Sequence, residues 1–205
     1  PTGTQTVHDV SVYTDWSLES IERGFQEQEK LFYILTNSRS MTQAQTEKTH
    51  REIAERTLQA AQRQKRPFLL LSRCDSTLRG HYPLETQVLR DTLAMHDYLV
   101  DGEILCPFFQ AGGRYTIDNV HYALYEEELI PVADTEFARD KTFGYRSSSL
   151  PDYIEEKTNG RYAAQDVVCI SLRQIRACDY TGIQDQLMSV TDFRKVVVNA
   201  VAPCD

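Results

Sequence analysis

The chain has 205 residues, which is enough for one α/β domain with a sizeable core. Its 41% hydrophobic and 25% charged residues are typical of a globular protein, and its formal net charge of −8 argues against a general nucleic-acid binder. No run of about 18 apolar residues suggests a membrane span. The five cysteines have no Cys-x-x-Cys spacing and the histidines no metal spacing, so neither a disulfide framework nor a metal site is indicated. We expect a cytoplasmic protein that binds neither membrane nor nucleic acid.

Apolar, β-rich runs alternate with helical patterns along the chain. The candidate strands are residues 10–13, 31–35, 68–72, 104–109, 167–171 and 196–201. Ser17 is predicted to cap a first helix, Thr42 and Gln45 form a capping box that opens a second helix to about Gln64, and a third helix is predicted over 83–96. This order predicts an α/β fold, with a mostly parallel sheet and helices on both faces in three layers.

Two later segments have patterns of their own. Residues 114–132 alternate around Asp118-Asn119 and then around an acidic turn, which predicts a β-hairpin-like excursion. A further helix is predicted to begin near Ser149, with Pro151 in its first turn, and to stop at Asn159-Gly160. The chain opens on a turn-like Pro1-Thr2-Gly3 and closes just after a strand. We therefore expect a single domain over 1–205 that is truncated at both ends and lacks its first strand.

Candidate site residues lie in the loops that follow the predicted strands, because ligands of open α/β sheets bind outside the carboxyl ends of the strands. They are Thr2, Gly3, Ser38, Arg39, Asp75, Ser76, Thr77, Arg79, Gly113 and Arg114. Guanidinium groups bind carboxylates bidentately, while hydroxyl and carboxylate side chains bind sugar hydroxyls. This mixture predicts a site for a small polyhydroxylated acid. The alternative is that the arginines form structural salt bridges and that Ser76 and Thr77 cap the following helix.

The string Asp75-Ser76-Thr77-Leu78-Arg79-Gly80 resembles a motif of the four-carbon acid sugar kinase family. Residues 107–116 resemble the family's Gly-Arg-Thr loop, and residues 134–140 resemble its Thr-Glu-Phe-Ala-Arg-Asp motif. The opening Pro1-Thr2-Gly3 matches the tail of an Asp-Asp-x-Thr-Gly motif. The resemblance implies the N-terminal sugar-acid-binding domain of a kinase whose nucleotide-binding domain, with ATP and Mg²⁺, lies C-terminal to this chain.

In such a kinase the γ-phosphoryl group of ATP passes to a hydroxyl of a four-carbon sugar acid of the threonate, erythronate or oxo-tetronate type. The resemblance implies that Asp75, or an aspartate upstream of this chain, accepts the hydroxyl proton, and that Arg79 binds the substrate carboxylate. Arg39 and Arg114 would be secondary anion contacts, and Thr2, Gly3 and Gly113 would help to form the pocket. The side chains of Ser38, Ser76 and Thr77 would bind hydroxyls. This chain alone is expected to be inactive, and a homodimer is a candidate assembly.

Several points stay open at the level of sequence. Thr4-Gln5 and Arg73-Cys74 depart from the family pattern, so the acid need not be threonate or erythronate. The 134–140 segment could contact the site or only shape its loop, and His81 is more typical of a structural histidine than of an acid–base catalyst. The alternatives to a kinase are a non-catalytic sugar-acid sensor and a Rossmann-like nucleotide-binding protein. No phosphate-cradling glycine motif supports the latter.

Overall fold

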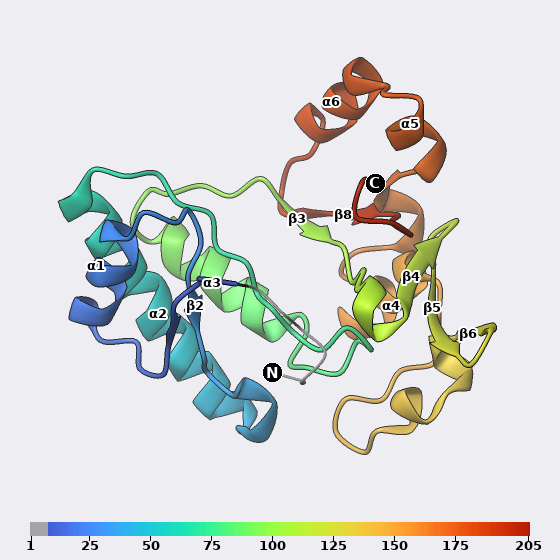
Figure 1. The fold of residues 1–205 in the computed structure, drawn as a ribbon, viewed down its shortest axis with the longest axis horizontal. Coiled ribbons are helices and arrows are strands. Elements are labelled where there is room, and N and C mark those ends of the chain that lie inside the picture. The colour runs from blue at the N-terminus through green and yellow to red at the C-terminus, as the bar shows by residue number, and fades with distance from the viewer. Residues whose placement is uncertain (1–7) are drawn as a thin grey trace. The chain divides into compact units, whose positions relative to one another are not determined.

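A computed structural model describes residues 8–205 (Figure 1). Within it the chain forms two compact units. Unit 1 comprises residues 8–73 and His81–Leu99, and unit 2 comprises Cys74–Gly80 and Val100–Asp205. The predicted site residues Thr2 and Gly3 lie outside the described residues. The prediction of a single domain stays a prediction.

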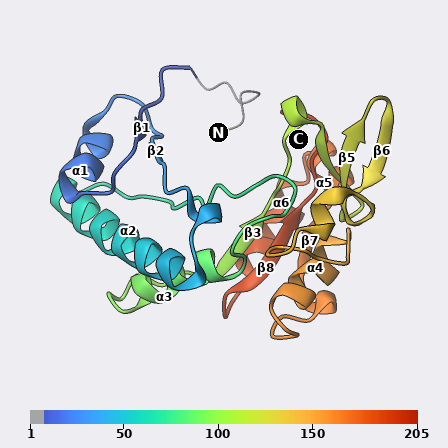
Figure 2. The ribbon, with the colours of Figure 1, turned by 90° about the horizontal axis from the view of Figure 1, so that it is seen from below.

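Unit 1 contains a short parallel pair of strands and three helices. Strand β1 (Val12–Tyr13) pairs with β2 (Tyr33–Ile34), and the helices are α1 (Leu18–Gln26), α2 (Gln43–Gln64) and α3 (Leu84–Ala94). Helix α2 packs against both α1 and α3 (Figure 2). The predicted caps are confirmed, because Ser17 accepts the amide hydrogen of Ser20 and Thr42 forms a capping box with Gln45.

The predicted strand at residues 68–72 is wrong as a strand. Its side chains alternate as expected, with Phe68 partly buried against the α1–α2 core while Leu69 and Leu71 are 81% and 70% exposed. The segment forms no strand ladder with the described residues. Alternating side-chain burial alone therefore did not make this segment a strand, because a strand also requires a hydrogen-bonded neighbour.

Unit 2 contains a parallel sheet of three strands in the order β3 (Gly102–Leu105), β8 (Arg194–Val198), β7 (Val168–Ile170). Its helices are α4 (Leu150–Lys157), α5 (Leu172–Arg176) and α6 (Tyr180–Met188). The sequence patterns of this region did not predict α5 and α6. Helix α4 is followed by Asn159 and Gly160 at φ 52° and 76°, so its predicted end is confirmed. With parallel strands and helices in both units, the α/β class is confirmed.

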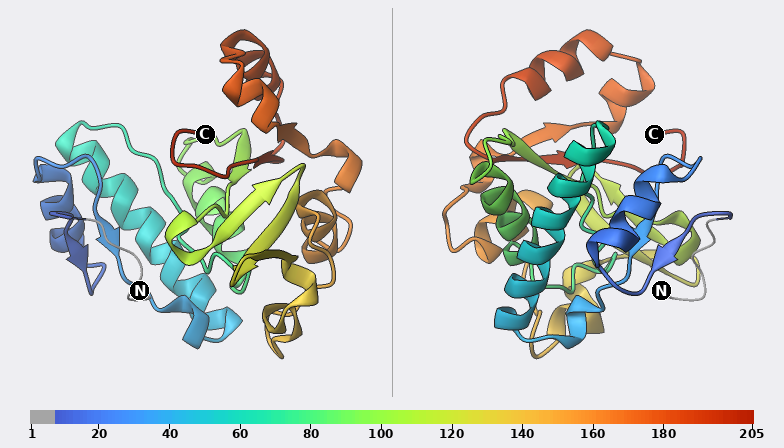
Figure 3. Two further views of the ribbon diagram at one scale, coloured as in Figure 1. Left: turned by 45° about the vertical axis from the view of Figure 1, so that its right-hand side comes forward. Right: turned by 90° about the vertical axis from the view of Figure 1, so that its left-hand side faces the viewer.

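The predicted hairpin excursion is an antiparallel sheet of β4 (Arg114–Ile117), β5 (Val120–Tyr125) and β6 (Glu128–Pro131) (Figure 3). Asp118 and Asn119 connect β4 to β5 with φ of 47° and 66°, which is the backbone of a two-residue primed turn. The prediction is confirmed and extended by a third strand.

Short 3-10 helices connect several of these elements. They are η1 (Ser38–Ser40), η2 (Gln110–Gly112), η3 (Val132–Asp134), η4 (Glu136–Arg139) and η5 (Ala164–Asp166). Among residues 8–205, no helix combines the length and the apolar character that crossing a membrane requires.

Candidate functional site

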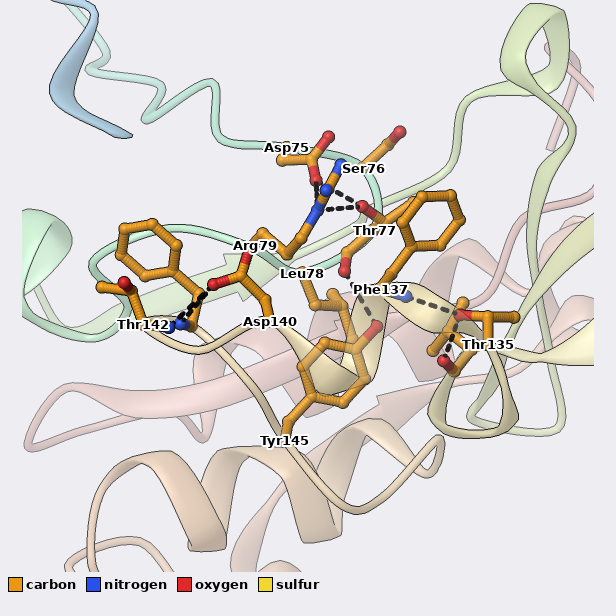
Figure 4. Close-up of polar contacts among 12 residues, drawn as sticks. Asp75, Ser76, Thr77, Leu78, Arg79, Thr135, Phe137, Asp140, Thr142 and Tyr145 are labelled. Carbon is orange, nitrogen blue, oxygen red and sulfur yellow. Dashed lines mark hydrogen bonds and ion pairs between the residues drawn. The ribbon is translucent and has the colours of Figure 1, made fainter. Parts of the chain in front are cut away.

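The loop Asp75–Gly80 is held by its backbone from within unit 2. The carbonyl oxygens of residues 76–78 accept hydrogen bonds from His121 Nε2 (2.8 Å), Tyr145 Oη (2.9 Å) and Tyr153 Oη (3.2 Å), in that order. All three donor side chains are buried. Figure 4 shows the tyrosine contact to Thr77 beneath the loop. Three successive carbonyl groups are thus satisfied by side chains far away in the sequence.

Burial keeps these three donors neutral. Loss of solvation and, to a smaller extent, the nearby charge of Arg114 lower the pKa of His121 to about 4. Burial likewise raises the pKa of Tyr145 and of Tyr153 far above the usual range. A carbonyl oxygen can only accept, so His121 carries its proton on Nε2, and its Nδ1 lies 3.0 Å from the hydroxyl of Thr116, which donates to it.

The loop turns sharply at Leu78. This residue has φ of 65°, a left-handed conformation that is costly for a residue with a branched side chain. Its amide donates to the carbonyl of Asp75 at 3.0 Å, and its side chain is buried. The buried Leu78 side chain and the hydrogen bond from Tyr153 to the Leu78 carbonyl hold the turn. The polar side chains of Thr77 and Arg79, on either side of Leu78, therefore have defined positions.

Asp75, Thr77 and Arg79 form a network on this loop (Figure 4). Arg79 Nε donates to Asp75 Oδ2 at 2.7 Å and to Thr77 Oγ1 at 3.0 Å, and the Thr77 hydroxyl donates to the same carboxylate. Thr77 is buried, whereas the side chains of Asp75 and Arg79 are 18% and 25% exposed. Among the described residues, no hydrogen bond involves the terminal amino groups of Arg79. A ligand could therefore bind there while Asp75 and Thr77 hold Nε.

Arg114 lies beside this network through its contact with Phe137. Gly113, at φ 70°, precedes it, and a side chain at this position would meet Leu124 Cβ at 2.9 Å. Arg114 Nη1 donates to the Gly112 carbonyl. The guanidinium carbon atoms of Arg79 and Arg114 lie 4.7 Å and 5.3 Å from the centre of the Phe137 ring. Two cationic groups thus share one aromatic ring.

A carboxylate accompanies these two cations. Glu136 accepts a hydrogen bond from Tyr125 Oη at 2.8 Å. The pKa of Glu136 is lowered, first by hydrogen bonds from its own backbone and from Tyr125, and further by the charges of Arg79 and Arg114. Segment 134–140 was expected either to contact the site or only to shape its own loop. Glu136 lies close enough to Arg79 and Arg114 for their charges to act on it, which favours the first alternative for this residue.

The end of this segment shapes its own loop. Asp140 Oδ1 accepts the amide hydrogen of Thr142 at 2.8 Å, as Figure 4 shows, and that of Phe143 at 3.0 Å. Arg139 is exposed. Segment 134–140 thus divides into Glu136, which lies near the arginines, and Asp140, which caps a turn.

Two of the predicted site residues lie in unit 1. Ser38 Oγ donates to Glu85 Oε1 at 2.7 Å, and Ser72 Oγ donates to Glu85 Oε2 at 2.9 Å. Glu85 is buried and lies 4.0 Å from His50 Nε2. Arg39 is exposed in the same 3-10 helix as Ser38. These contacts give Ser38 a fixed position and identify Glu85, which the sequence reading passed over.

His81 has a structural environment. It is buried, and its Nε2 lies 2.9 Å from the carbonyl oxygen of Met41, to which it donates. This agrees with the structural alternative for His81. Among the described residues there is also no group of three or more metal-ligating side chains that could hold a metal ion.

Unit 1 also has an open groove of about 670 Å³, lined among others by Trp16, Arg56 and Arg63. It contains none of the predicted site residues. Arg56 pairs with Glu52 at 3.4 Å and Arg63 with Glu22 at 3.0 Å, so its cations are already neutralised. The arginines of the groove thus use terminal nitrogen atoms for their ion pairs, whereas Arg79 pairs through Nε.

Six of the predicted site residues lie in one unit, and their roles in binding stay predictions. Asp75, Ser76, Thr77, Arg79, Gly113 and Arg114 all lie in unit 2. The sequence reading missed the supporting residues His121, Tyr145 and Tyr153, and it gave Phe137 no role. A buried histidine on the inward-facing side of β5 was a usable signal, since β5 alternates strictly between inward and outward positions.

The chain matches solved structures over nearly its whole length. A protein of Bordetella bronchiseptica, described as a domain of unknown function with bound citrate and as a domain-swapped dimer, has a TM-score of 0.62 at 19% identity, with 93% of this chain and 41% of that chain covered. A Haemophilus influenzae protein has a TM-score of 0.58 at 12% identity, with 94% and 48% covered. A protein of Salmonella typhimurium described as a putative tRNA synthase has a TM-score of 0.60 at 14% identity, with 95% and 48% covered.

At these identities the likeness shows a shared fold, and the chain spans less than half the length of each of these structures. No curated protein matches the chain. A family model described as "Sugar-binding N-terminal domain" matches residues 1–205. The chain therefore belongs to the family of sugar-binding N-terminal domains, which confirms the resemblance to the N-terminal domain of four-carbon acid sugar kinases drawn from the motifs around Asp75.

Proposed function

We propose that this chain is the acceptor-binding domain of an ATP-dependent kinase that phosphorylates a four-carbon sugar acid. The observation that carries the proposal is the pair of guanidinium groups in unit 2. Arg79 keeps its terminal amino groups clear of protein hydrogen bonds, and Arg114 lies against the same aromatic ring. A guanidinium with its outer N–H groups exposed matches a carboxylate in geometry and charge.

An acid ligand is supported by the Bordetella bronchiseptica protein of the same fold, which holds citrate. In the proposed site the acid carboxylate binds to Arg79, with Arg114 as a secondary contact. Ser76 would bind a sugar hydroxyl. Thr77 was predicted to do the same, but its hydroxyl lies buried between Asp75 and Arg79, so its contribution is to hold these two groups.

Asp75 has two conceivable roles in such a kinase. Its carboxylate holds Arg79 Nε at 2.7 Å, which is a positioning role. A carboxylate at this place could also accept the proton of the attacking hydroxyl, as phosphoryl transfer requires. We assign Asp75 the role of positioning Arg79. Asp75 and an aspartate upstream of this chain are also the two candidate bases.

The nucleotide is expected on another domain. Gly112-Gly113 is the only glycine pair in the chain and lacks the spacing of a phosphate-cradling loop, so ATP and Mg²⁺ are assigned to a domain C-terminal to this chain. The roles of Ser38 and Arg39, which lie in unit 1, and of Thr2 and Gly3, which lie outside the described residues, stay predictions from the sequence. We further propose a cytoplasmic protein that forms a homodimer, because the Bordetella bronchiseptica protein is a domain-swapped dimer.

The direct test is ATP consumption by the full-length protein with a panel of threonates, erythronates and oxo-tetronates. Saturable, acid-dependent ATP consumption supports the kinase. Acid binding that is detected by calorimetry without any ATP consumption favours a non-catalytic sugar-acid sensor instead. Tight, saturable binding of ATP or NAD to residues 1–205 alone would favour the Rossmann-like alternative.

Two variants then test the assigned residues. Arg79→Ala should lower kcat/KM for the acid by about 10-fold or more, because one charge-assisted contact is lost. Asp75→Asn should remove most activity and leave the fold intact. Arg63→Ala, which removes an exposed arginine paired with Glu22 in unit 1, is the matched control and should have wild-type kinetics. Wild-type kinetics for Arg79→Ala would exclude Arg79 from the site.

A further inference from the structure

We propose that Phe137 is a positioning residue for acid binding, whose ring holds the guanidinium groups of Arg79 and Arg114 together as one two-arginine anion clamp. This inference rests on the proposed function and deepens it. It assigns a role to a side chain that carries no charge and no hydrogen-bonding group, and it explains how two like charges come to lie against one ring.

One ring contacts side chains from two separate segments of unit 2. Arg79 belongs to the motif loop Asp75–Gly80, and Arg114 begins β4. Their guanidinium carbon atoms lie 4.7 Å and 5.3 Å from the centre of the Phe137 ring, both within the range of cation–π attraction. All three side chains are partly buried, so the ring excludes water from one side of each cation and solvent can still reach the cluster.

The ring is itself firmly held. Phe137 lies in η4, whose N-cap Thr135 accepts the Phe137 amide hydrogen at 3.3 Å. The Thr135 hydroxyl is buried and donates to the Val132 carbonyl at 2.6 Å. The Tyr125 ring lies 6.5 Å from the Phe137 ring, centre to centre. A ring fixed in this way can fix the guanidinium groups that lie over it.

The charges around the ring leave the clamp ready for an anion. Asp75 holds Arg79 through Nε at 2.7 Å, and Arg114 donates to a backbone carbonyl, which carries no charge. Glu136, next to Phe137 in the chain, accepts a hydrogen bond from Tyr125 and offsets only part of the charge of Arg79 and Arg114. A carboxylate bound by these guanidinium groups gains charge-assisted contacts that a neutral sugar cannot make, so Phe137 should favour charged acids over neutral sugars.

The test compares Phe137→Leu with Phe137→Tyr in the full-length protein, with threonate as substrate and its neutral amide as the control ligand. Phe137→Leu removes the aromatic face and should raise KM for threonate by about 5-fold to 30-fold, with kcat nearly unchanged. Phe137→Tyr keeps the face and should behave as wild type. The affinity for the amide should not change in either variant.

A second arm separates this role from general stability. In an Arg79→Ala, Arg114→Ala background, Phe137→Leu should cause no further loss of affinity, because the groups that it positions are gone. If Phe137→Leu fails to fold, as judged by its thermal midpoint, Phe137→Met replaces it as an apolar side chain of similar volume.

The outcomes distinguish the inference from the proposed function. ATP consumption with an unchanged KM in Phe137→Leu, an equal loss for acid and amide, or a Phe137→Tyr variant as impaired as Phe137→Leu would each overturn the inference and leave the kinase intact. Calorimetric binding of threonate or citrate that depends on Phe137, without ATP consumption, would support the inference and reject the kinase. A protein that binds no acid of the panel would overturn both.

Discussion

Protonation of His121 should make the stability of unit 2 depend on pH. The imidazole is fully buried in β5, between the Ser76 carbonyl and the Thr116 hydroxyl, and close to the positive charge of Arg114. Its pKa is lowered from 6.5 to about 4, chiefly by burial. Between these two pH values the unfolded chain binds a proton that the folded chain excludes, so stability falls as the pH falls through this window.

The size of the effect follows from the two pKa values of His121. Relative to pH 8, the free energy of unfolding should decrease by about 2 kcal/mol at pH 5 and by about 3 kcal/mol at pH 4 from this one group. The Ser76 carbonyl partly offsets the effect of burial on the pKa, because its hydrogen bond is stronger to the protonated, charged ring than to the neutral ring.

The assay compares the wild type with His121→Gln, because the amide nitrogen of glutamine can replace Nε2 as donor to the loop and does not titrate. Guanidinium-induced unfolding, followed by circular dichroism, gives the free energy of unfolding of each protein at about pH 8 and about pH 5. Carboxylate effects cancel in the difference between the proteins. Between about pH 8 and about pH 5, the wild type should lose about 2 kcal/mol of unfolding free energy relative to His121→Gln. An unchanged difference would refute the assignment of a buried neutral imidazole.

Three further substitutions test the supports of unit 2. Lys195→Met should cost about 3–5 kcal/mol in unfolding free energy, because it leaves the buried carboxylate of Glu103 without its cation; a double variant with Glu103→Leu should recover most of the loss. Tyr145→Phe should cost about 1–2 kcal/mol and weaken acid binding, since one loop carbonyl loses its donor; equal binding would show that the loop does not need this contact. Gly113→Ala should destabilise by about 1–3 kcal/mol because of the positive φ at this position, and a neutral thermal melt would contradict this.

The sequence correctly predicted the helix ends and the hairpin turn, because the residues that mark them lie close together in the chain. Ser17, the Thr42 capping box and Asn159-Gly160 mark helix ends by hydrogen bonds within a few residues, and the Asp118-Asn119 turn marks its hairpin in the same way. Residues 68–72 have an equally clear strand pattern but form no strand within residues 8–205, because a strand must pair with a partner elsewhere in the chain. The helices α5 and α6 had usable caps at Ser171 and Asp179 that were not recognised.

The candidate site was predictable only in its polar members. Asp75 and Arg79 are four residues apart in one loop, so their pairing is within reach of a sequence reading. Tyr145 and Tyr153 contact that loop from 68 and 75 residues away, and nothing near them in the sequence indicates it. Phe137 is read from the sequence as an ordinary apolar residue, and only the positions of both arginines give it another role.

The three carbonyl contacts beneath the loop Asp75–Gly80 separate the course of its backbone from the identity of its polar side chains. His121, Tyr145 and Tyr153 bind main-chain atoms, which every residue type possesses. Position 76, which carries a partly exposed serine, can therefore change without altering the course of the loop. Related chains with the same buried donors could in this way keep the same loop backbone and bind different acids. The buried donors would then be common to such chains, and the polar side chains of the loop would differ with the acid.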